Sequence, residues 1–418
     1  NIFRDGTRRF IQGNMIYKPN AALSSLTLEK TIAPTPSTSD TDNPGGLALP
    51  NGGRVSLVDM DLDGQLDLVI STRSTSNTAY AFIYIADPVT GDIKASKVIP
   101  NASNSSYPFV GDIDGDGYPE IVFIKCVGGV ANAATRKMYA YKYVPGNPVL
   151  QKFWELDHSD DSGSTSMTLF DFNQDGISEI IYRDETHMRI INGSLKHHQT
   201  GLPVAVPYNL AEIKCSSGTS TEYPVVADID GDGQAEIVIV GGNDRTVDPY
   251  HLGHLWVFKS GNPVDSPWAP ARKVWNQFAY NSLNINEDLT VPQYNLNPAT
   301  VFPGYDGVLG TSDDVRPFNN FLQQQTMLSK NGNPLWLTPK AEIVNVPTFI
   351  YNDVTDKMTI TVEVKNGGDV AFQAPFYVTV HKDVVPGAKQ YIYTYNNPIA
   401  VNETVTMIIV LDNFETDW

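Results

Sequence analysis

The 418-residue sequence is short of charge, and above all of positive charge. Charged residues make up 18 % of the chain, and 29 Lys and Arg stand against 47 Asp and Glu, which gives a net charge of −18. A surface of that sign repels phosphate backbones and anionic lipid headgroups, so we expect no nucleic-acid partner. There is also no run of about 18 apolar residues, the length that a membrane-spanning helix requires, so we expect no membrane insertion.

Cysteine is almost absent as well. Cys126 and Cys215 have neither the spacing of a zinc site nor that of a disulfide scaffold, so a disulfide between them and two buried thiols both remain open. Catalytic motifs are missing too: the sequence has no Gly-x-Ser-x-Gly, no His-Glu-x-x-His and no phosphate-binding glycine loop. The sequence therefore predicts a protein that is not an enzyme.

Turn-forming residues, by contrast, are plentiful. Gly (32) and Pro (28) disfavour a helical bundle, while 41 % hydrophobic residues suffice for a sizeable core. Four segments align without gaps: VDMDLDGQLDLVI, GDIDGDGYPEIVFI, FDFNQDGISEIIY and ADIDGDGQAEIVIV. Each follows a short apolar strand pattern, ends in a β-branched run, and three of the four are followed by an alternating aromatic strand such as AFIYIA. Their leading acids lie 53, 59 and 57 positions apart, which predicts one four-stranded antiparallel sheet per repeat.

A single sheet of that size cannot bury its faces, so the copies must pack on one another. We therefore predict an all-β fold, a β-propeller of four-stranded blades followed by an Ig-like β-sandwich. The propeller is expected over residues 1–285, with blades near 55–107, 108–165, 166–222 and 223–285 and a partial blade and loop over 1–54. An irregular connector with one short helix at 320–329 is expected over 286–340, and an incomplete sandwich over 341–418.

Each repeat holds a nine-residue acidic turn with oxygen-bearing side chains at positions 1, 3, 5 and 9 and Gly at position 6. Alternate side chains of a tight loop point inward, so these four and the carbonyl of position 7 are expected to converge, while Gly permits the positive φ of the turn. The expected ligands of the first two loops are Asp59, Asp61, Asp63, Gln65, Asp67, Asp112, Asp114, Asp116, Tyr118 and Glu120. Those of the last two are Asp171, Asn173, Asp175, Ile177, Glu179, Asp228, Asp230, Asp232, Gln234 and Glu236.

Carboxylates forced together repel one another, and a divalent cation removes that cost. All-oxygen coordination favours Ca²⁺ over Zn²⁺ and Mg²⁺, so we predict about four Ca²⁺ sites. The third loop, with Asn173 in place of an acid, is expected to bind most weakly. An EF-hand is rejected because position 12 is Ile70, Phe123, Tyr182 or Ile239 rather than an acid. Metal-free Asx turns are the alternative interpretation.

These repeats resemble the FG-GAP or VCBS family, whose calcium-loop blades build the propellers of integrin α-subunits and of many bacterial surface proteins. The resemblance runs from about Val55 to Lys259, and it implies Ca²⁺ in the hairpin between the first two strands of each blade and no catalytic residue. VGG at Val127 and VGGN at Val240 stand at the family's second turn, although its Gly-Ala-Pro is not intact. With VEVKNGGDVAFQAPFYVTV, residues 341–418 are similar to CARDB-like Ig-like modules of bacterial adhesins. KVWNQFAYNSLNINEDLTVP and RPFNNFLQQQT resemble segments of large surface proteins of gliding, type IX-secreting bacteria.

Other groups carry less specific signals. A fifth metal loop is weighed against an ordinary Asp-Gly turn at Asp306, Asp313 and Asp314. Loop histidines are expected at His251 and His254, and a solvated loop rather than an acid–base cluster at Asp157, His158, Asp160 and Asp161. Core packing or loop anchoring, rather than a sugar-binding surface, is expected of Tyr107, Tyr223, Trp268 and Trp275.

These features predict a non-enzymatic, secreted calcium-binding protein of the cell surface, an adhesin or a scaffold for protein or glycan ligands. Millimolar extracellular Ca²⁺ matches the affinity of extracellular loops, so we expect an outer-surface location, in bacteria. One alternative is a polysaccharide-processing enzyme or carbohydrate-binding protein, whose acids or His/Tyr pair would lie in an axial pocket. Another is a structural segment of a surface filament. The sequence opens at Asn1 without Met or a leader, so we expect a section of a longer polypeptide with further domains.

Overall fold

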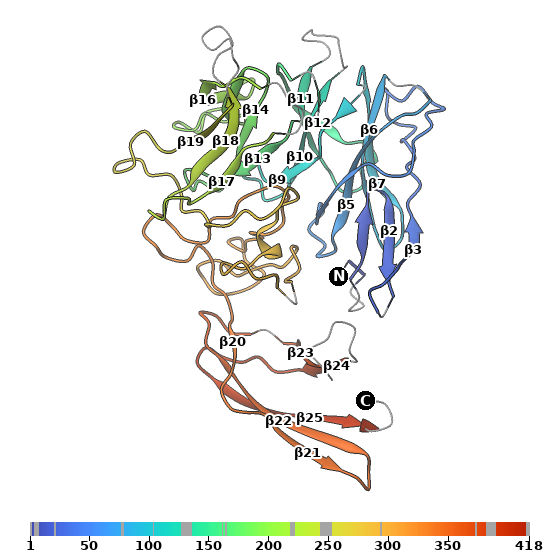
Figure 1. Ribbon diagram of the computed structural model, residues 1–418, viewed down its shortest axis with the longest axis vertical. Helices are drawn as coiled ribbons and strands as arrows, with labels where there is room; N and C mark the ends of the chain where they lie inside the picture. The colour runs from blue at the N-terminus through green and yellow to red at the C-terminus, as the bar shows by residue number, and fades with distance from the viewer. Residues whose placement is uncertain are drawn as a thin grey trace. The chain divides into compact units, whose positions relative to one another are not determined.

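The computed structural model describes residues 2–3, 8–20, 22–76, 79–102, 104–126, 136–160, 162–163, 165–217, 222–242, 253–292, 295–372, 374–381 and 390–414. Within them the chain is all-β, as predicted, with 25 strands and one short 3₁₀ turn, η1 (Ser282–Asn284) (Figure 1). No helix in this described part is long and apolar enough to cross a membrane. His251, Asp161 and the VGG at Val127 lie outside the described residues.

Contacts divide the chain into two compact units. The first unit comprises Asn1–Pro19, Leu26–Thr300 and Arg316–Asn333, and the second comprises Asn20–Ser25, Val301–Val315 and Pro334–Trp418. The first unit contains all four repeats, and the residues expected to form the connector are shared between the two units.

The first unit is a series of antiparallel sheets that follow one another along the chain (Figure 1). An N-terminal sheet has the order β1 (Phe10–Gln12), β2 (Met15–Pro19), β3 (Leu26–Thr31). Sheet 1 is β4 (Arg54–Val58), β5 (Asp67–Arg73), β6 (Tyr80–Ala86) and β7 (Ile93–Pro100). Sheet 2 is β9 (Phe109–Gly111), β10 (Glu120–Cys126), β11 (Lys137–Lys142) and β12 (Gln151–Asp157), with β8 (Asn104–Ser105) also beside β10. Sheet 3 is β13 (Met167–Phe170), β14 (Glu179–Arg183), β15 (His187–Asn192) and β16 (Tyr208–Lys214), and sheet 4 is β17 (Val225–Ala227), β18 (Glu236–Gly242) and β19 (Gly253–Phe258).

The sheets pack face to face in chain order, which explains why their second strands are apolar on both sides. Every residue of β10 is buried, as expected for a strand covered on both faces. In β14, Ile180 and Tyr182 pack with sheet 2, whereas Ile181 on the opposite face packs with sheet 4. The first strands β4, β9, β13 and β17 are neighbours in that order. The repeats therefore share continuous cores instead of each forming its own.

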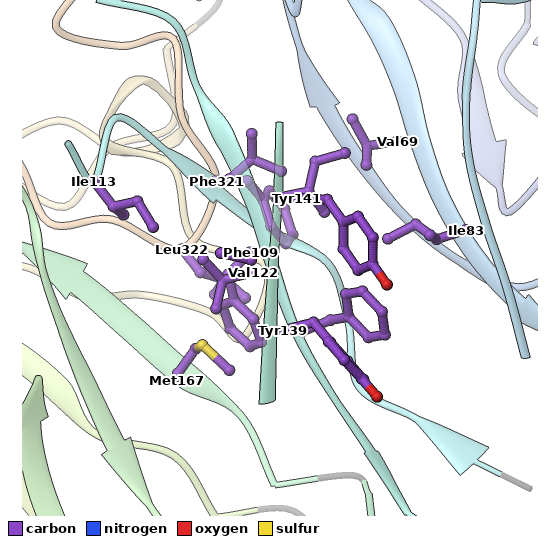
Figure 2. Packing of buried hydrophobic residues seen from close by; sticks show 14 of the residues in the cluster. Val69, Ile83, Phe109, Ile113, Val122, Tyr139, Tyr141, Met167, Phe321 and Leu322 are labelled. Atoms are coloured by element: carbon purple, nitrogen blue, oxygen red, sulfur yellow. The ribbon is translucent and has the colours of Figure 1, made fainter. Parts of the chain in front are cut away.

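A returning segment, residues 319–324, crosses the first strands of all four sheets. Phe321 exchanges backbone hydrogen bonds with Val110 of sheet 2. Leu322 accepts, and Gln324 donates, a backbone hydrogen bond at Leu169 of sheet 3. Figure 2 shows Phe321 and Leu322 among the buried side chains of these sheets.

The two ends of the returning segment bind the outer sheets of the series. Asn319 hydrogen-bonds to the backbone of Asp59, directly after β4 of sheet 1. The side-chain amide of Gln324 donates to Val226 O in sheet 4, at 2.9 Å. One short stretch of chain thus joins sheets 1 to 4.

The helix predicted at residues 320–329 is wrong. This stretch forms isolated bridges to β9 and β13 and no helix. Its sequence, NFLQQQTMLS, contains good helix formers, but its backbone groups bond to strand edges and the side-chain amide of Gln324 donates to backbone carbonyls. Tertiary hydrogen bonding overrides a weak local propensity here.

The second unit has two antiparallel sheets over one core. The larger contains β20 (Ala341–Ile343), β21 (Thr348–Asn352), β22 (Lys357–Asn366) and β25 (Thr404–Asp412), and the smaller contains β23 (Phe376–His381) and β24 (Gln390–Tyr395). In β22, every second residue from Ile360 to Asn366 is buried. Val378 and Tyr393 of the smaller sheet pack on this apolar face.

Both cysteines lie in the first unit. Cys126 ends β10, Cys215 follows β16, and both are buried thiols. Of the two possibilities that the sequence leaves open, the structure therefore has the buried thiols.

Candidate metal centres

The acidic turns are the hairpins between the first and second strands of the four sheets. They are loop 1 (residues 59–67, after β4), loop 2 (112–120, after β9), loop 3 (171–179, after β13) and loop 4 (228–236, after β17). Loops 2 and 3 contact each other, because Ser178 N donates a 3.1 Å hydrogen bond to Asp112 O. We number the residues of each loop from 1 to 9.

All four loops have the same backbone conformation, which two left-handed residues produce. The position-6 glycines have φ values of 86°, 85°, 84° and 88°. Position 4 is also left-handed, at 60° for Leu62, 75° for Gly115, 62° for Gln174 and 80° for Gly231. Glycine adopts this region without a steric penalty, whereas Leu62 and Gln174 do not. The sequence predicted the turn at position 6 and missed the one at position 4.

Backbone N–H groups donate hydrogen bonds to one oxygen of the position-1, position-5 and position-9 acids in each loop. The position-6 glycine donates to the position-1 carboxylate at 2.8, 2.9, 2.9 and 3.2 Å in loops 1 to 4. Position 2 donates to the position-9 carboxylate at 3.1, 3.0, 2.9 and 3.0 Å. The position-7 residues, Gln65, Tyr118, Ile177 and Gln234, donate to the position-5 carboxylate at 2.7, 2.9, 2.9 and 2.8 Å. These bonds fix the acids and leave a second oxygen on the position-5 and position-9 groups for another partner.

In each of loops 1, 2 and 4, three acids of the loop form a cluster. Ligand oxygens lie within 4.8 Å of one another in three groups: Asp59, Asp61 and Asp67; Asp112, Asp114 and Glu120; and Asp228, Asp230 and Glu236. Loop 3 forms no such group among the described residues. There, Asn173 Nδ2 donates to Asp175 Oδ2 at 3.0 Å, so an amide occupies the position-5 oxygen.

The position-9 acids are buried, and burial disfavours their charged form. Burial raises the pKa of Asp67 to about 7 and the pKa values of Glu120 and Glu179 to about 8. Neighbouring acids of the same loop add to the rise, for example Asp114 beside Glu120. A cation at the centre would favour the charged forms by the opposite effect.

Lysine side chains enter loops 1 and 2 from other strands. Lys94 of β7 places Nζ 2.7 Å from Asp61 Oδ2 and 2.8 Å from Asp67 Oδ1. Lys142, the last residue of β11, places Nζ 2.6 Å from Asp114 Oδ2, 2.6 Å from Asp116 Oδ2 and 3.4 Å from Glu120 Oε1. Neither lysine was predicted from the sequence.

Loop 4 has looser lysine contacts. Lys259 Nζ lies 3.3 Å from Asp230 Oδ2, and Lys273 Nζ lies 4.0 Å from Asp228 Oδ2, with both side chains more than half exposed. Glu236 Oε1 is buried and has no hydrogen-bond partner among the described residues. The position-3 acid of loop 1 has a similar oxygen, Asp61 Oδ1.

The donor set fits a calcium ion. The side chains that converge in loops 1, 2 and 4 all offer carboxylate oxygens, and these clusters contain no imidazole or thiol. The buried Oε1 of Glu236 has no hydrogen-bond partner among the described residues, so it is available as a ligand. Hard oxygen ligands in flexible loops suit Ca²⁺. The position-7 carbonyls remain predicted ligands.

The other candidate residues form no comparable cluster in the part of the chain that the structure describes. Asp306 N donates to Asp313 Oδ2 at 3.2 Å, and Asp314 Oδ2 accepts from Gly310 N at 2.7 Å, so these acids bond the backbone of their own loop. The loop position predicted for His254 is wrong, because this residue lies within β19, where its ring packs on Trp256. Trp275 stacks on Tyr280 with ring centroids 4.1 Å apart.

The remaining three aromatics also contact aromatic neighbours. Tyr107 and Tyr223 each lie against Phe278, with centroids 5.0 and 4.9 Å apart, and Trp268 lies 4.6 Å from Phe172. These contacts agree with the predicted role in packing and loop anchoring.

The solvated loop expected near His158 is wrong for Asp160. Asp160 is fully buried and accepts hydrogen bonds from Ser162, and burial lowers the pKa of His158, whose ring meets Tyr182 edge-on. Asp157, by contrast, forms an ion pair with Lys137 at 2.6 Å. Asp160 is buried and Asp157 is not, because only Asp160 lies close to the core of sheets 2 and 3. The local sequence does not encode this proximity.

Comparison with known proteins identifies one repeat. Residues 59–123, from position 1 of loop 1 to β10, match the FG-GAP-like repeat family. No curated protein matches the sequence significantly. Among solved structures, the chain is similar to the V. cholerae biofilm matrix protein Bap1, with 14 % identity, a TM-score of 0.33, and coverage of 75 % of this chain and 83 % of that one. It is also similar to the Photorhabdus luminescens Tc holotoxin pore, with 16 % identity, a TM-score of 0.26, and coverage of 62 % of this chain and 13 % of that one.

Proposed function

We propose that this chain is a secreted or cell-surface, non-enzymatic binding protein of the adhesin type, whose acidic loops are held by Ca²⁺. The observation that carries the proposal is the repeated hairpin, in which backbone hydrogen bonds aim buried carboxylate oxygens at one point in loops 1, 2 and 4. The FG-GAP-like match over the first two loops supports it.

The architecture that fits this function is a β-propeller with an Ig-like module. The face-to-face sheets in chain order and the neighbouring first strands β4, β9, β13 and β17 support a radial arrangement of blades. The two sheets of the second unit, which share one core, support the Ig-like module. In this arrangement the loops between blades would present a surface to a protein or glycan.

Calcium would act by mass action on the folded state. The side chains at positions 1, 3, 5 and 9 of each loop, all carboxylates except Asn173 of loop 3, would hold it, and the ion would supply the positive charge that the buried acids need. Each occupied site contributes about 2.7 kcal/mol when free Ca²⁺ is 100-fold above Kd. Millimolar Ca²⁺ outside the cell matches extracellular loops of this kind, whereas cytosolic Ca²⁺ would leave them mostly empty.

Thermal unfolding tests the proposal. Transferring the protein from 2 mM Ca²⁺ to excess EDTA should lower Tm by about 5 °C or more, the consequence of losing a few kcal/mol in a unit of this size. Mg²⁺ at the same concentration should not restore Tm. A change of less than one or two degrees would contradict the structural role of calcium.

The binding role needs a separate test. Glycan arrays and binding to cell surfaces should give a signal, while a panel of polysaccharides should give no turnover. Turnover of any glycan would favour the enzyme alternative.

A further inference from the structure

We propose that Lys94 and Lys142 are internal counter-ions of loops 1 and 2, and that a divalent cation binds these loops by displacing them. The inference rests on the proposed calcium function and adds a mechanism for these loops.

The contacts of Lys142 are those of a cation at the centre of the loop. Its ammonium touches Asp114 Oδ2, Asp116 Oδ2 and Glu120 Oε1, on positions 3, 5 and 9. The other oxygens of all three groups accept backbone hydrogen bonds: Asp114 Oδ1 from Asp116 N, Asp116 Oδ1 from Tyr118 N and Glu120 Oε2 from Ile113 N. The lysine therefore uses the oxygens that the backbone leaves over, which are the ones that a metal ion requires.

Lys94 makes equivalent contacts in loop 1 from a different strand. It touches Asp61 Oδ2 and Asp67 Oδ1, on positions 3 and 9, and lies 4.0 Å from Asp63 Oδ2, on position 5. Its side chain is only 16 % exposed. Two loops thus receive an ammonium group at the same three positions from unrelated places in the sequence.

The strand register explains the lysines of loops 2 and 4. Lys142 directly follows Tyr141, which pairs with Ile121 beside the position-9 acid, and Lys259 directly follows Phe258, which pairs with Ile237 in the same place. In sheet 3 this position is Asn192, whose side chain accepts hydrogen bonds from Ser194 instead.

Sheet 1 has an acid, Asp87, at the corresponding position, directly after Ala86, the partner of Leu68. Lys94 of the next strand compensates for it. Loop 3, which has one carboxylate fewer, has no lysine ion pair among the described residues.

An ammonium group and a divalent cation cannot occupy the same oxygens, because like charges at this distance repel strongly. Without metal, Lys94 and Lys142 hold loops 1 and 2 together. With metal, the lysines must swing away, so the affinity of these loops is lower than their carboxylate count alone indicates.

Substitution of Lys142 by Met tests the proposal, with Lys137→Met as the matched control. Met keeps the apolar stem and removes the charge, and Lys137 lies on the same strand but pairs with Asp157 and Glu155, away from the loop. Ca²⁺ is titrated calorimetrically into the full chain, freed of metal by chelation, and Tm is measured in EDTA.

K142M should bind Ca²⁺ at one site at least about tenfold more tightly than the wild type. A charge at this distance changes the affinity of a carboxylate for a proton by about one to three pK units, and removal of the lysine charge should change the affinity for Ca²⁺ at least as much. Its Tm in EDTA should fall below that of K137M, which keeps the wild-type affinity. In the double variant K142M/D114N, the gain in affinity should disappear.

The outcomes separate the two proposals. Wild-type binding with an unchanged or weaker affinity in K142M would overturn the exchange mechanism alone. Binding by K142M but not by the wild type would support the lysine as counter-ion and overturn the calcium function of native loop 2. Absence of binding in both would overturn both, and a Tm of K142M in EDTA at or above that of K137M would overturn the counter-ion role.

Discussion

The side chain of Asn319 closes two hydrogen bonds on the backbone of Asp59, 260 positions earlier in the chain. Asp59 N donates to Asn319 Oδ1, and Asn319 Nδ2 donates to Asp59 O, both at 2.8 Å. Asp59 is position 1 of loop 1, so the returning segment fixes the start of a candidate metal centre. It does so with an amide, which supplies the donor and the acceptor together.

Replacing Asn319 by Ala should lower the free energy of unfolding by about 2–4 kcal/mol, because it leaves a buried N–H and a buried C=O of Asp59 without partners. Chemical denaturation measures the change. Asn333→Ala, at an exposed position of the same unit, should change stability by less than about 0.5 kcal/mol. Equal effects of the two substitutions would show that the bonds to Asp59 add nothing.

Leu62→Gly should stabilise the metal-free protein by about 0.5 kcal/mol. Leu62 has φ of 60°, and a left-handed non-glycine residue destabilises the folded state by about 1–2 kcal/mol. Gly removes this strain, but its greater entropy in the unfolded state offsets part of the gain in stability. The reciprocal change at position 4 of loop 4, Gly231→Ala, should destabilise by about 1 kcal/mol, since Gly231 has φ of 80°. Urea denaturation of both variants in EDTA measures these changes, and effects of the same sign would contradict the strain argument.

Glu236→Gln should have opposite effects with and without calcium. Gln keeps an oxygen for Ile229 N but removes the charge beside the unpartnered Oε1, so in EDTA the unfolding free energy should stay unchanged or rise by up to about 1 kcal/mol. In Ca²⁺ the variant should lose most of the stabilisation from loop 4, because a ligand of the ion is missing. A similar loss of stability in both buffers would mean that Glu236 serves packing alone.

Asp184 should make stability depend on acid pH. Burial alone would raise its pKa, but Arg189 and the N–H groups of Thr186 and His187 lower the pKa to about 2. The folded value lies below the unfolded value of 3.8, so the contribution, about 2 kcal/mol, is complete above pH 4 and is lost as pH falls towards 2. Asp184→Asn should therefore destabilise at pH 7 and converge with the wild type near pH 2.

Denaturation between pH 2 and pH 7 checks this expectation. Asp157→Asn, at an acid whose carboxylate is largely exposed, is the control, and it should have a small effect at every pH. An Asp184→Asn deficit that persists unchanged at pH 2 would contradict the argument.

The sequence was sufficient for features that repeat or that depend on neighbouring residues. The acidic hairpins, their flanking strands and the φ of Gly64 and its three equivalents follow from a local pattern that occurs four times. The convergence of acids was predicted for loop 3 as well, but Asn173 directs its amide to Asp175 and no cluster of three forms there.

Features that depend on distant residues were missed. Nothing near Lys94 indicates a loop 33 positions earlier. Lys142 ends β11 and Lys259 directly follows β19, so a comparison of the corresponding segments KMYAYK and HLWVFK would have found these two lysines. The returning segment was taken for a helix because its hydrogen-bond partners, Val110 and Leu169, are far away in the sequence. Local propensity carries no information about such partners.

The order in which residues 319–324 meet the four sheets has a consequence for biosynthesis. Sheets 1 to 4 are synthesised long before Asn319 and Gln324. Until the returning segment is made, the edges of β9 and β13 that it pairs with have no partner from it. Unpaired strand edges recruit other chains, and contacts this remote form slowly. We therefore expect the first unit to be completed only when this segment binds, and the nascent chain to be most prone to aggregation before that step.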